Sequence, residues 1–108
     1  MEAIARRNER TISINGKTIE LPASIRHGII FQNIFVVVLD AYYSMRNVFA
    51  FDEEGNQIWT IEEPDFEVKG VGYALVDGDG GKLMALCRGV QFFIDPKTGK
   101  IYDSYFDK

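Results

Sequence analysis

The stretch Asn47-Val-Phe-Ala-Phe-Asp-Glu-Glu-Gly-Asn-Gln-Ile-Trp59 decides the fold, because the chain repeats its plan in Val90-Gln-Phe-Phe-Ile-Asp-Pro-Lys-Thr-Gly-Lys-Ile-Tyr102. In both copies an apolar strand ends on an aspartate, a glycine follows three or four residues later, and a strand bearing an aromatic residue comes next. Such an aspartate accepts hydrogen bonds from backbone amides two residues on, and the glycine permits the positive φ that reverses the chain. We therefore interpret Asp52 and Asp95, 43 positions apart, as turn-building residues.

Working outward from these turns, each copy reads as a meander of four short strands. The first meander covers residues 25–61 and the second covers residues 71–106. Segments 34–39 and 48–51 are apolar without alternation, which predicts that both faces of the first meander are covered. We therefore predict an all-β fold of about ten strands, in which two blade-like antiparallel meanders pack as a sandwich or flattened barrel.

A β-hairpin is predicted before the meanders, over residues 11–21. Asn15-Gly16 separates two alternating segments, and this pair tolerates the positive φ that a type I′ turn requires at both central positions. In that register one face carries the apolar residues Ile12, Ile14, Ile19 and Leu21. We expect this face to extend or cover one edge of the meanders, and we expect residues 1–10 to form at most a frayed, charged turn.

Length and composition fit one all-β domain over residues 1–108. Apolar residues make up 46% of the chain and charged residues 26%, which is enough to bury a core. Cys87 is the single cysteine, so no internal disulfide can form, and a reducing cytoplasmic location is expected. No apolar run has the length of a signal peptide core or a membrane span, so we expect no membrane partner.

Charge is distributed unevenly along the chain, whose formal net charge is −4. Residues 1–50 carry six basic and four acidic side chains, whereas residues 51–108 carry six and twelve. Nucleic-acid binding requires a basic face that neutralises phosphates. The acidic second half therefore argues against a nucleic-acid partner.

Residues 47–59 resemble a blade of a quinoprotein-type β-propeller. The whole chain resembles a group of small uncharacterised bacterial proteins with an Asn-Gly hairpin, a Leu-Pro step and two such meanders. The matching stretches are Ile14-Asn-Gly-Lys17, Ile19-Glu-Leu-Pro22, Val48 to Trp59, and Ile94-Asp-Pro-Lys-Thr-Gly-Lys-Ile101. A closed ring needs about four blades or more. The resemblance thus implies a blade-like fold; the cofactor sites of propellers have no counterpart here, and the group brings no known activity with it.

The segment Asp77-Gly78-Asp79-Gly80-Gly81 spaces two carboxylates as a calcium loop does. The later ligand positions of such a loop hold Gly81 and Arg88, so a hairpin turn solvated by aspartates is the favoured interpretation. A carboxylate site for a metal or small ligand at Asp77 and Asp79, with Asp52 as a further candidate, remains the alternative.

His27 and Cys87 are the only imidazole and the only thiol in the sequence. A nucleophilic pair would require the two side chains to meet in space. Because Cys87 ends an apolar strand, a buried and inert thiol is the favoured interpretation, and we expect His27 at the surface or at a strand edge. We interpret the acidic residues between positions 52 and 67 as a solvated rim that protects outer strands from pairing.

The loop Asp40-Ala-Tyr-Tyr-Ser-Met-Arg46 joins two strands that we expect to be buried, where the second copy has only Arg88-Gly89. Insertions on a rigid scaffold often carry function, and tyrosine and arginine dominate interface energetics. A tyrosine that merely caps the core is the alternative. We expect a non-enzymatic module, without cofactor, that binds a protein partner or a second copy of itself, an immunity or antitoxin role being one form. Its expected contact residues are Tyr42, Tyr43, Met45, Arg46 and Trp59.

Overall fold

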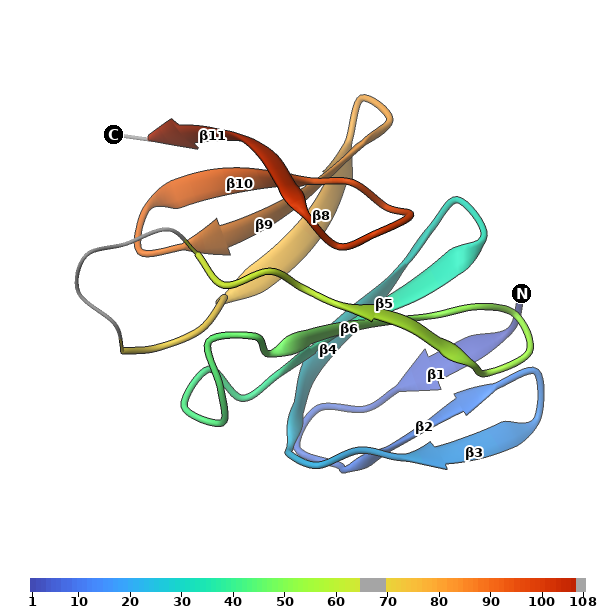
Figure 1. The fold of residues 1–108 in the computed structure, drawn as a ribbon. Helices are drawn as coiled ribbons and strands as arrows, with labels where there is room; N and C mark the ends of the chain where they lie inside the picture. Colours follow the sequence, from blue (N-terminus) through green and yellow to red (C-terminus); the bar gives the residue numbers. More distant parts are fainter. Residues whose placement is uncertain (65–69, 107–108) are drawn as a thin grey trace.

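The computed structural model describes residues 1–64 and 70–106, apart from the side chain of Asp79. Within that part, eleven strands and no helix are present. The strands form three antiparallel sheets, which we call A, B and C, and none of them closes into a barrel. Sheet B lies between the other two (Figure 1). The all-β prediction is confirmed, and the arrangement is a stack of three layers.

Sheet A contains β1 (Ala3–Ala5), β2 (Thr11–Ile14) and β3 (Lys17–Glu20). The hairpin β2–β3 forms as predicted: Ile14 pairs with Lys17, and the φ angles of Asn15 and Gly16 are 48° and 84°. The frayed turn expected over residues 1–10 is wrong, because β1 pairs with β2. The physical reason is that every second residue packs on the apolar cluster beneath sheet A, namely Met1, Ala3 and Ala5. The charged residues of this segment obscured that alternation in the sequence.

Sheet B contains β4 (Ile25–Phe31), β5 (Ile34–Leu39), β6 (Val48–Phe51) and β7 (Gln57–Thr60), in that order. Its central strands are buried on both faces, as predicted. On one face Phe35, Val37, Leu39, Phe49 and Phe51 meet sheet A, and on the other Val36, Val38, Val48 and Ala50 meet sheet C. Odd-numbered side chains of β5 and β6 face sheet A and even-numbered ones face sheet C. Because both faces are covered, apolar residues do not alternate with polar ones in these strands.

Sheet A covers a face of sheet B, whereas the sequence suggested an edge. Ile12 and Ile14 share one apolar cluster with Phe35 and Val37. At the crossing between the sheets, the amide of Ile25 donates to the Glu9 carbonyl at 2.8 Å. Burying this face removes aromatic and aliphatic surface from water, which pairing along an edge would not do.

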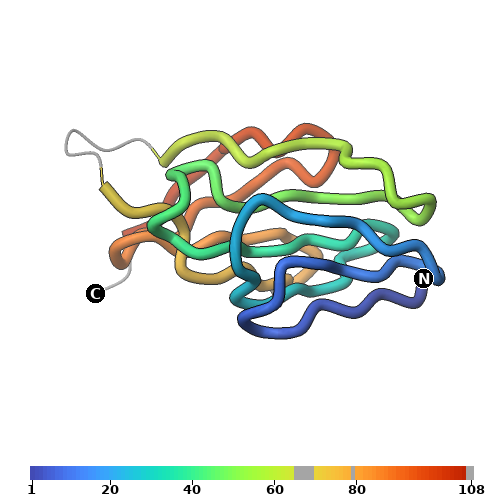
Figure 2. Tube along the Cα trace, turned by 90° about the horizontal axis from the view of Figure 1, so that it is seen from below, coloured from blue at the N-terminus to red at the C-terminus, as the bar shows by residue number. Residues whose placement is uncertain are grey.

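Sheet C contains β8 (Leu75–Asp79), β9 (Lys82–Cys87), β10 (Val90–Ile94) and β11 (Ile101–Phe106), in the order β11-β10-β9-β8. Figure 2 shows the blue N-terminal strands and the red final strand on opposite sides of the molecule. The reversal between β8 and β9 needs only Gly80 and Gly81, both with positive φ. Asp77 and Asp79 therefore belong to a strand, and the turn predicted to start at Asp77 starts later.

Both aspartates of the repeat build turns, as predicted. Asp52 Oδ1 accepts hydrogen bonds from the amides of Glu54 and Asn56, each at 2.9 Å. Asp95 Oδ1 accepts from the amide of Lys97 at 2.9 Å. The hydrogen bonds at Asp52 hold its pKa below the ordinary value, and the bond from the Asn56 amide contributes most.

Candidate functional site

The loop 40–46 between β5 and β6 is held by hydrogen bonds within itself and by one backbone bond to the segment before β8. Asp40 Oδ1 accepts from the amide of Tyr42 at 2.9 Å, and Ser44 Oγ accepts from the amide of Arg46 at 3.0 Å. The carbonyl of Ala41 accepts from the amide of Gly72, in the segment that leads into β8, at 2.8 Å. The loop therefore presents its side chains from a fixed backbone.

Four of the five predicted contact residues lie on this loop. Tyr42 is 82% exposed and Tyr43 46% exposed, while Met45 is half-buried. Arg46 is exposed, but its Nε donates to the carbonyl of Ile61 at 2.9 Å and its Nη2 to that of Thr60 at 3.3 Å. The two tyrosines are thus presented outward, whereas Arg46 also fastens the end of β7.

Trp59, the fifth, does not join this surface, because its side chain is only 7% exposed. Its ring belongs to the cluster between sheets B and C, and its Nε1 donates to the carbonyl of Pro96 at 2.8 Å. A Cβ built on Gly99 would lie 2.6 Å from the ring. Trp59 is therefore a packing residue, which its polar sequence neighbours concealed.

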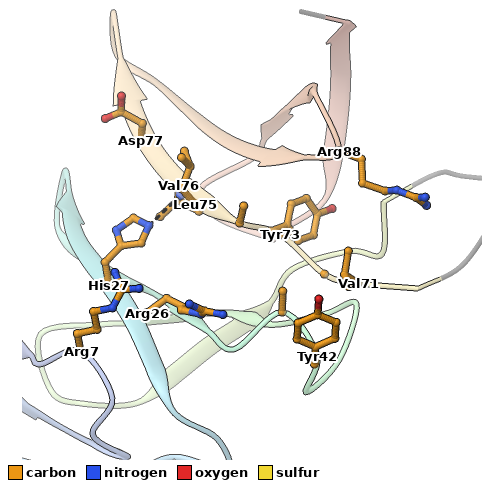
Figure 3. A pocket seen from close by; sticks show the side chains of 13 residues that line it. Arg7, Arg26, His27, Tyr42, Val71, Tyr73, Leu75, Val76, Asp77 and Arg88 are labelled. Atoms are coloured by element: carbon orange, nitrogen blue, oxygen red, sulfur yellow. Dashed lines mark hydrogen bonds between the residues drawn. The ribbon is translucent and has the colours of Figure 1, made fainter.

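A cleft of about 830 Å³ lies beside the loop, between the edge strands β4 and β8. We call it the β4–β8 cleft. Three arginines line it, Arg7, Arg26 and Arg88, together with the imidazole of His27. Tyr42 stands at the end nearest the loop (Figure 3). The exposed loop and the cleft therefore meet at Ala41 and Tyr42.

His27 reaches the cleft because β4 contains a bulge. Ile25 pairs with Leu39 and His27 pairs with the adjacent Val38, which leaves Arg26 as the extra residue. His27 Nε2 accepts a hydrogen bond from the amide of Val76 on β8 at 3.3 Å (Figure 3). The expected strand-edge position is confirmed.

The protonation of His27 follows from this setting. Burial lowers its pKa below the ordinary value of 6.5, Asp77 opposes that shift, and Arg7 adds to it. The imidazole is therefore neutral at pH 7. Because Nε2 accepts from Val76, the proton resides on Nδ1.

The carboxylate site expected as the alternative lies on β8. Asp77 Oδ1 accepts from the amide of Gly78 at 2.9 Å, and the side chain of Asp79 lies outside the described part of the structure. Asp52 is committed to its own turn. Among the described residues, no group of three or more His, Cys, Asp or Glu side chains could hold a metal ion.

Cys87 is buried at the end of β9, as predicted. Its Sγ lies 3.4 Å from the carbonyl of Gly72. Burial raises the pKa of this thiol, which disfavours the thiolate that a nucleophile requires. The structure gives Cys87 a packing role.

Sequence reasoning missed Asn47, a fully buried polar side chain at the end of the loop. Its Nδ2 donates to the carbonyls of Leu39 and Tyr73, both at 2.8 Å, and its Oδ1 accepts from the amide of Tyr73 at 2.7 Å. A Cβ on Gly72 would overlap both Asn47 Oδ1 and the carbonyl of Ser44. Asn47 therefore joins sheet B to the segment that leads into β8 and lines the cleft.

The arginines of the cleft were missed too, because they come from distant segments. Arg7 follows β1, Arg26 is the bulge residue of β4, and Arg88 is in the turn between β9 and β10. The positive balance of residues 1–50 was the one available indication of a basic surface.

Comparison with known proteins places this architecture in a family. The chain matches the domain of unknown function DUF7957 over residues 1–106. It belongs to this family. The resemblance to an uncharacterised family is thereby confirmed for the DUF7957 chain, whereas the bacterial origin and the relation to propeller blades stay predictions. No curated protein matches it.

One further property concerns membranes. Within residues 1–64 and 70–106, no helix of the DUF7957 chain has the length and apolar character that a membrane crossing needs.

Proposed function

We propose that the protein is a non-enzymatic binding module that contacts a partner protein, or a second copy of itself, through the loop 40–46. The observation that carries this proposal is the exposure of Tyr42, 82%, on a loop whose backbone is hydrogen-bonded to the scaffold. A tyrosine offered from a fixed backbone buries a large area at a low entropic cost. Tyr43, 46% exposed, enlarges the same surface.

The titratable groups of the described residues also favour binding over catalysis. Of the four groups with shifted pKa values, Asp52 builds a turn, and Tyr73 and Cys87 lie in the core. Tyr73 is held there by a hydrogen bond from its hydroxyl to the carbonyl of Glu62 at 2.7 Å. His27 and Tyr73 both line the β4–β8 cleft, but the Tyr73 hydroxyl is already bonded to Glu62, so His27, with Asp77 nearby, is the one of the four groups that could exchange a proton there.

The test begins with self-association, measured by sedimentation velocity over a range of protein concentrations. Immobilised protein is then used to capture partners from a cell extract, with quantification by mass spectrometry. The loop variant is Tyr42→Ala/Tyr43→Ala, and Arg46 is left intact because it holds the end of β7. The matched control is Tyr102→Ala/Tyr105→Ala on β11, whose tyrosines are 58% and 63% exposed.

We expect the loop variant to lose the dimer or the captured partner, and the control to keep it. Thermal unfolding of both variants verifies that each remains folded. If the loop variant retains every contact of the wild type, the loop is not the binding surface and the proposal fails.

A further inference from the structure

The β4–β8 cleft has the anatomy of a small-molecule site. Its volume of about 830 Å³ lies within the range of pockets that hold compact organic ligands. One wall is a continuous run of β8 and the residues before it, positions 71–77, which supplies apolar side chains such as Val71 and Leu75. An apolar wall with a few convergent polar groups is typical of such sites.

The charged side chains of the cleft are mainly cationic. Half of the six arginines in the sequence line it, namely Arg7, Arg26 and Arg88, although the whole chain carries a net charge of −4. Asp77 is the one acidic side chain among the described lining residues. Positive charge is therefore concentrated here, where it attracts anions.

The guanidinium groups of Arg7 and Arg26 retain donors for a ligand. Arg26 Nη2 lies 4.0 Å from Asp40 Oδ1, which is beyond hydrogen-bond length, and both side chains are 40% exposed. Among the described residues, no hydrogen bond or ion pair engages the guanidinium of Arg7. Figure 3 shows both side chains on the β4 side of the cleft, next to His27.

Side chains already engage several backbone groups of β8 and of the segment before it. His27 Nε2 accepts from the amide of Val76, and Asn47 engages both the amide and the carbonyl of Tyr73. Asp77 accepts from the amide of Gly78. An added strand would find these backbone groups occupied, which favours a small molecule bound by the side chains of the cleft over an extended peptide.

We propose that the β4–β8 cleft binds a small anionic molecule with an apolar or aromatic body, whose carboxylate or phosphate group is held by Arg7 and Arg26. The planar guanidinium groups match the two oxygens of such an anion. The body of the ligand packs against Leu75 and the exposed ring of Tyr42. This proposal does not depend on protein binding by the loop 40–46.

The test uses 8-anilinonaphthalene-1-sulfonate, an aromatic anion whose fluorescence rises in an apolar site. Its neutral counterpart, N-phenyl-1-naphthylamine, reports apolar binding alone. Each probe is titrated into the wild type, into Arg7→Gln/Arg26→Gln and into the control Arg6→Gln/Lys97→Gln. The control makes the same change in charge at two exposed residues that do not line the cleft.

We expect the sulfonate to bind the wild type and the control equally, and to bind the Arg7→Gln/Arg26→Gln variant about tenfold more weakly or worse, since charged hydrogen bonds are lost. The neutral probe should bind all three proteins alike. Equal sulfonate binding by the cleft variant and the control overturns the proposal, as does a neutral probe that binds the wild type as tightly as the sulfonate.

Competition then distinguishes the two sources of the anion. Pyrophosphate displaces the sulfonate most effectively if the cleft favours phosphate groups, and citrate does so if it favours carboxylates. Failure of both to displace it contradicts an anion site. Because the Arg7→Gln/Arg26→Gln variant keeps the loop 40–46 intact, the outcome of these titrations is distinguishable from that of the experiments with the loop variants.

Discussion

The replacement Asn47→Ala tests how sheet B is joined to the segment that leads into β8. It removes two donated hydrogen bonds and one accepted bond, and it leaves the carbonyl and amide of Tyr73 and the carbonyl of Leu39 without their side-chain partner. These groups belong to fully buried residues. A buried polar group that loses its partner costs ~1–3 kcal/mol.

For three such groups we expect the free energy of unfolding to fall by about 3–5 kcal/mol, because water entering the vacated space recovers part of the loss. Domains of this size are stable by about 5–15 kcal/mol. The variant should therefore lose a large share of its stability and unfold at a clearly lower urea concentration than the wild type.

Urea unfolding followed by the fluorescence of Trp59 and by circular dichroism measures this change. The control Asn33→Ala alters an exposed residue in the turn between β4 and β5 and should change stability by less than ~0.5 kcal/mol. Asn47→Asp keeps the acceptor for the Tyr73 amide but loses both donors, so it should also destabilise. Burial raises the pKa of the new carboxyl in the folded state, so the stability of this variant relative to the wild type should improve as the pH falls. The protonated carboxyl can then donate one hydrogen bond to a neighbouring carbonyl.

A loss below ~1 kcal/mol for Asn47→Ala, with an unchanged dependence on urea, would refute this account of the junction.

Three further outcomes follow from the same part of the molecule. Gly72→Ala should lower stability by about 1–3 kcal/mol in urea unfolding, because its Cβ overlaps Asn47 Oδ1; an unchanged midpoint contradicts this packing. Stability should fall as pH drops below the ordinary histidine value of 6.5, since the unfolded state binds a proton that folded His27 resists. This loss should be absent in His27→Gln, and an identical pH profile in both proteins contradicts it. Cys87 should react with Ellman's reagent only as the protein unfolds, so fast labelling under native conditions contradicts its burial.

Much of the fold could be predicted because its determinants are local. The Asn15-Gly16 turn and the aspartate turns at Asp52 and Asp95 act within a few residues, and each forms as predicted. The unbroken apolar run of β5 predicted that both faces of its sheet are covered, because successive side chains of a strand point to opposite faces. The pattern does not identify the segments that pack on each face.

The candidate site was harder to predict because long-range packing assembles it. Tyr42 could be named from the inserted loop, since exposure of an inserted polar loop is a local property. Trp59 was misjudged because its polar neighbours resemble those of an exposed strand, yet the turn that contains Gly99 folds over its ring. Burial of that kind depends on a contact 40 residues away in the sequence.

The bulge at Arg26 shows how one residue controls the cleft. In a regular strand Ile25, His27 and Ile29 would share a face, and His27 would then point toward sheet A with Ile25. Instead Ile25 packs beneath sheet A, whereas Ile29 and Phe31 pack toward sheet C. The register shift between Ile25 and His27 produces this change of face. It aims the imidazole at β8, so the hydrogen bond from the Val76 amide to His27 depends on this irregularity of the strand.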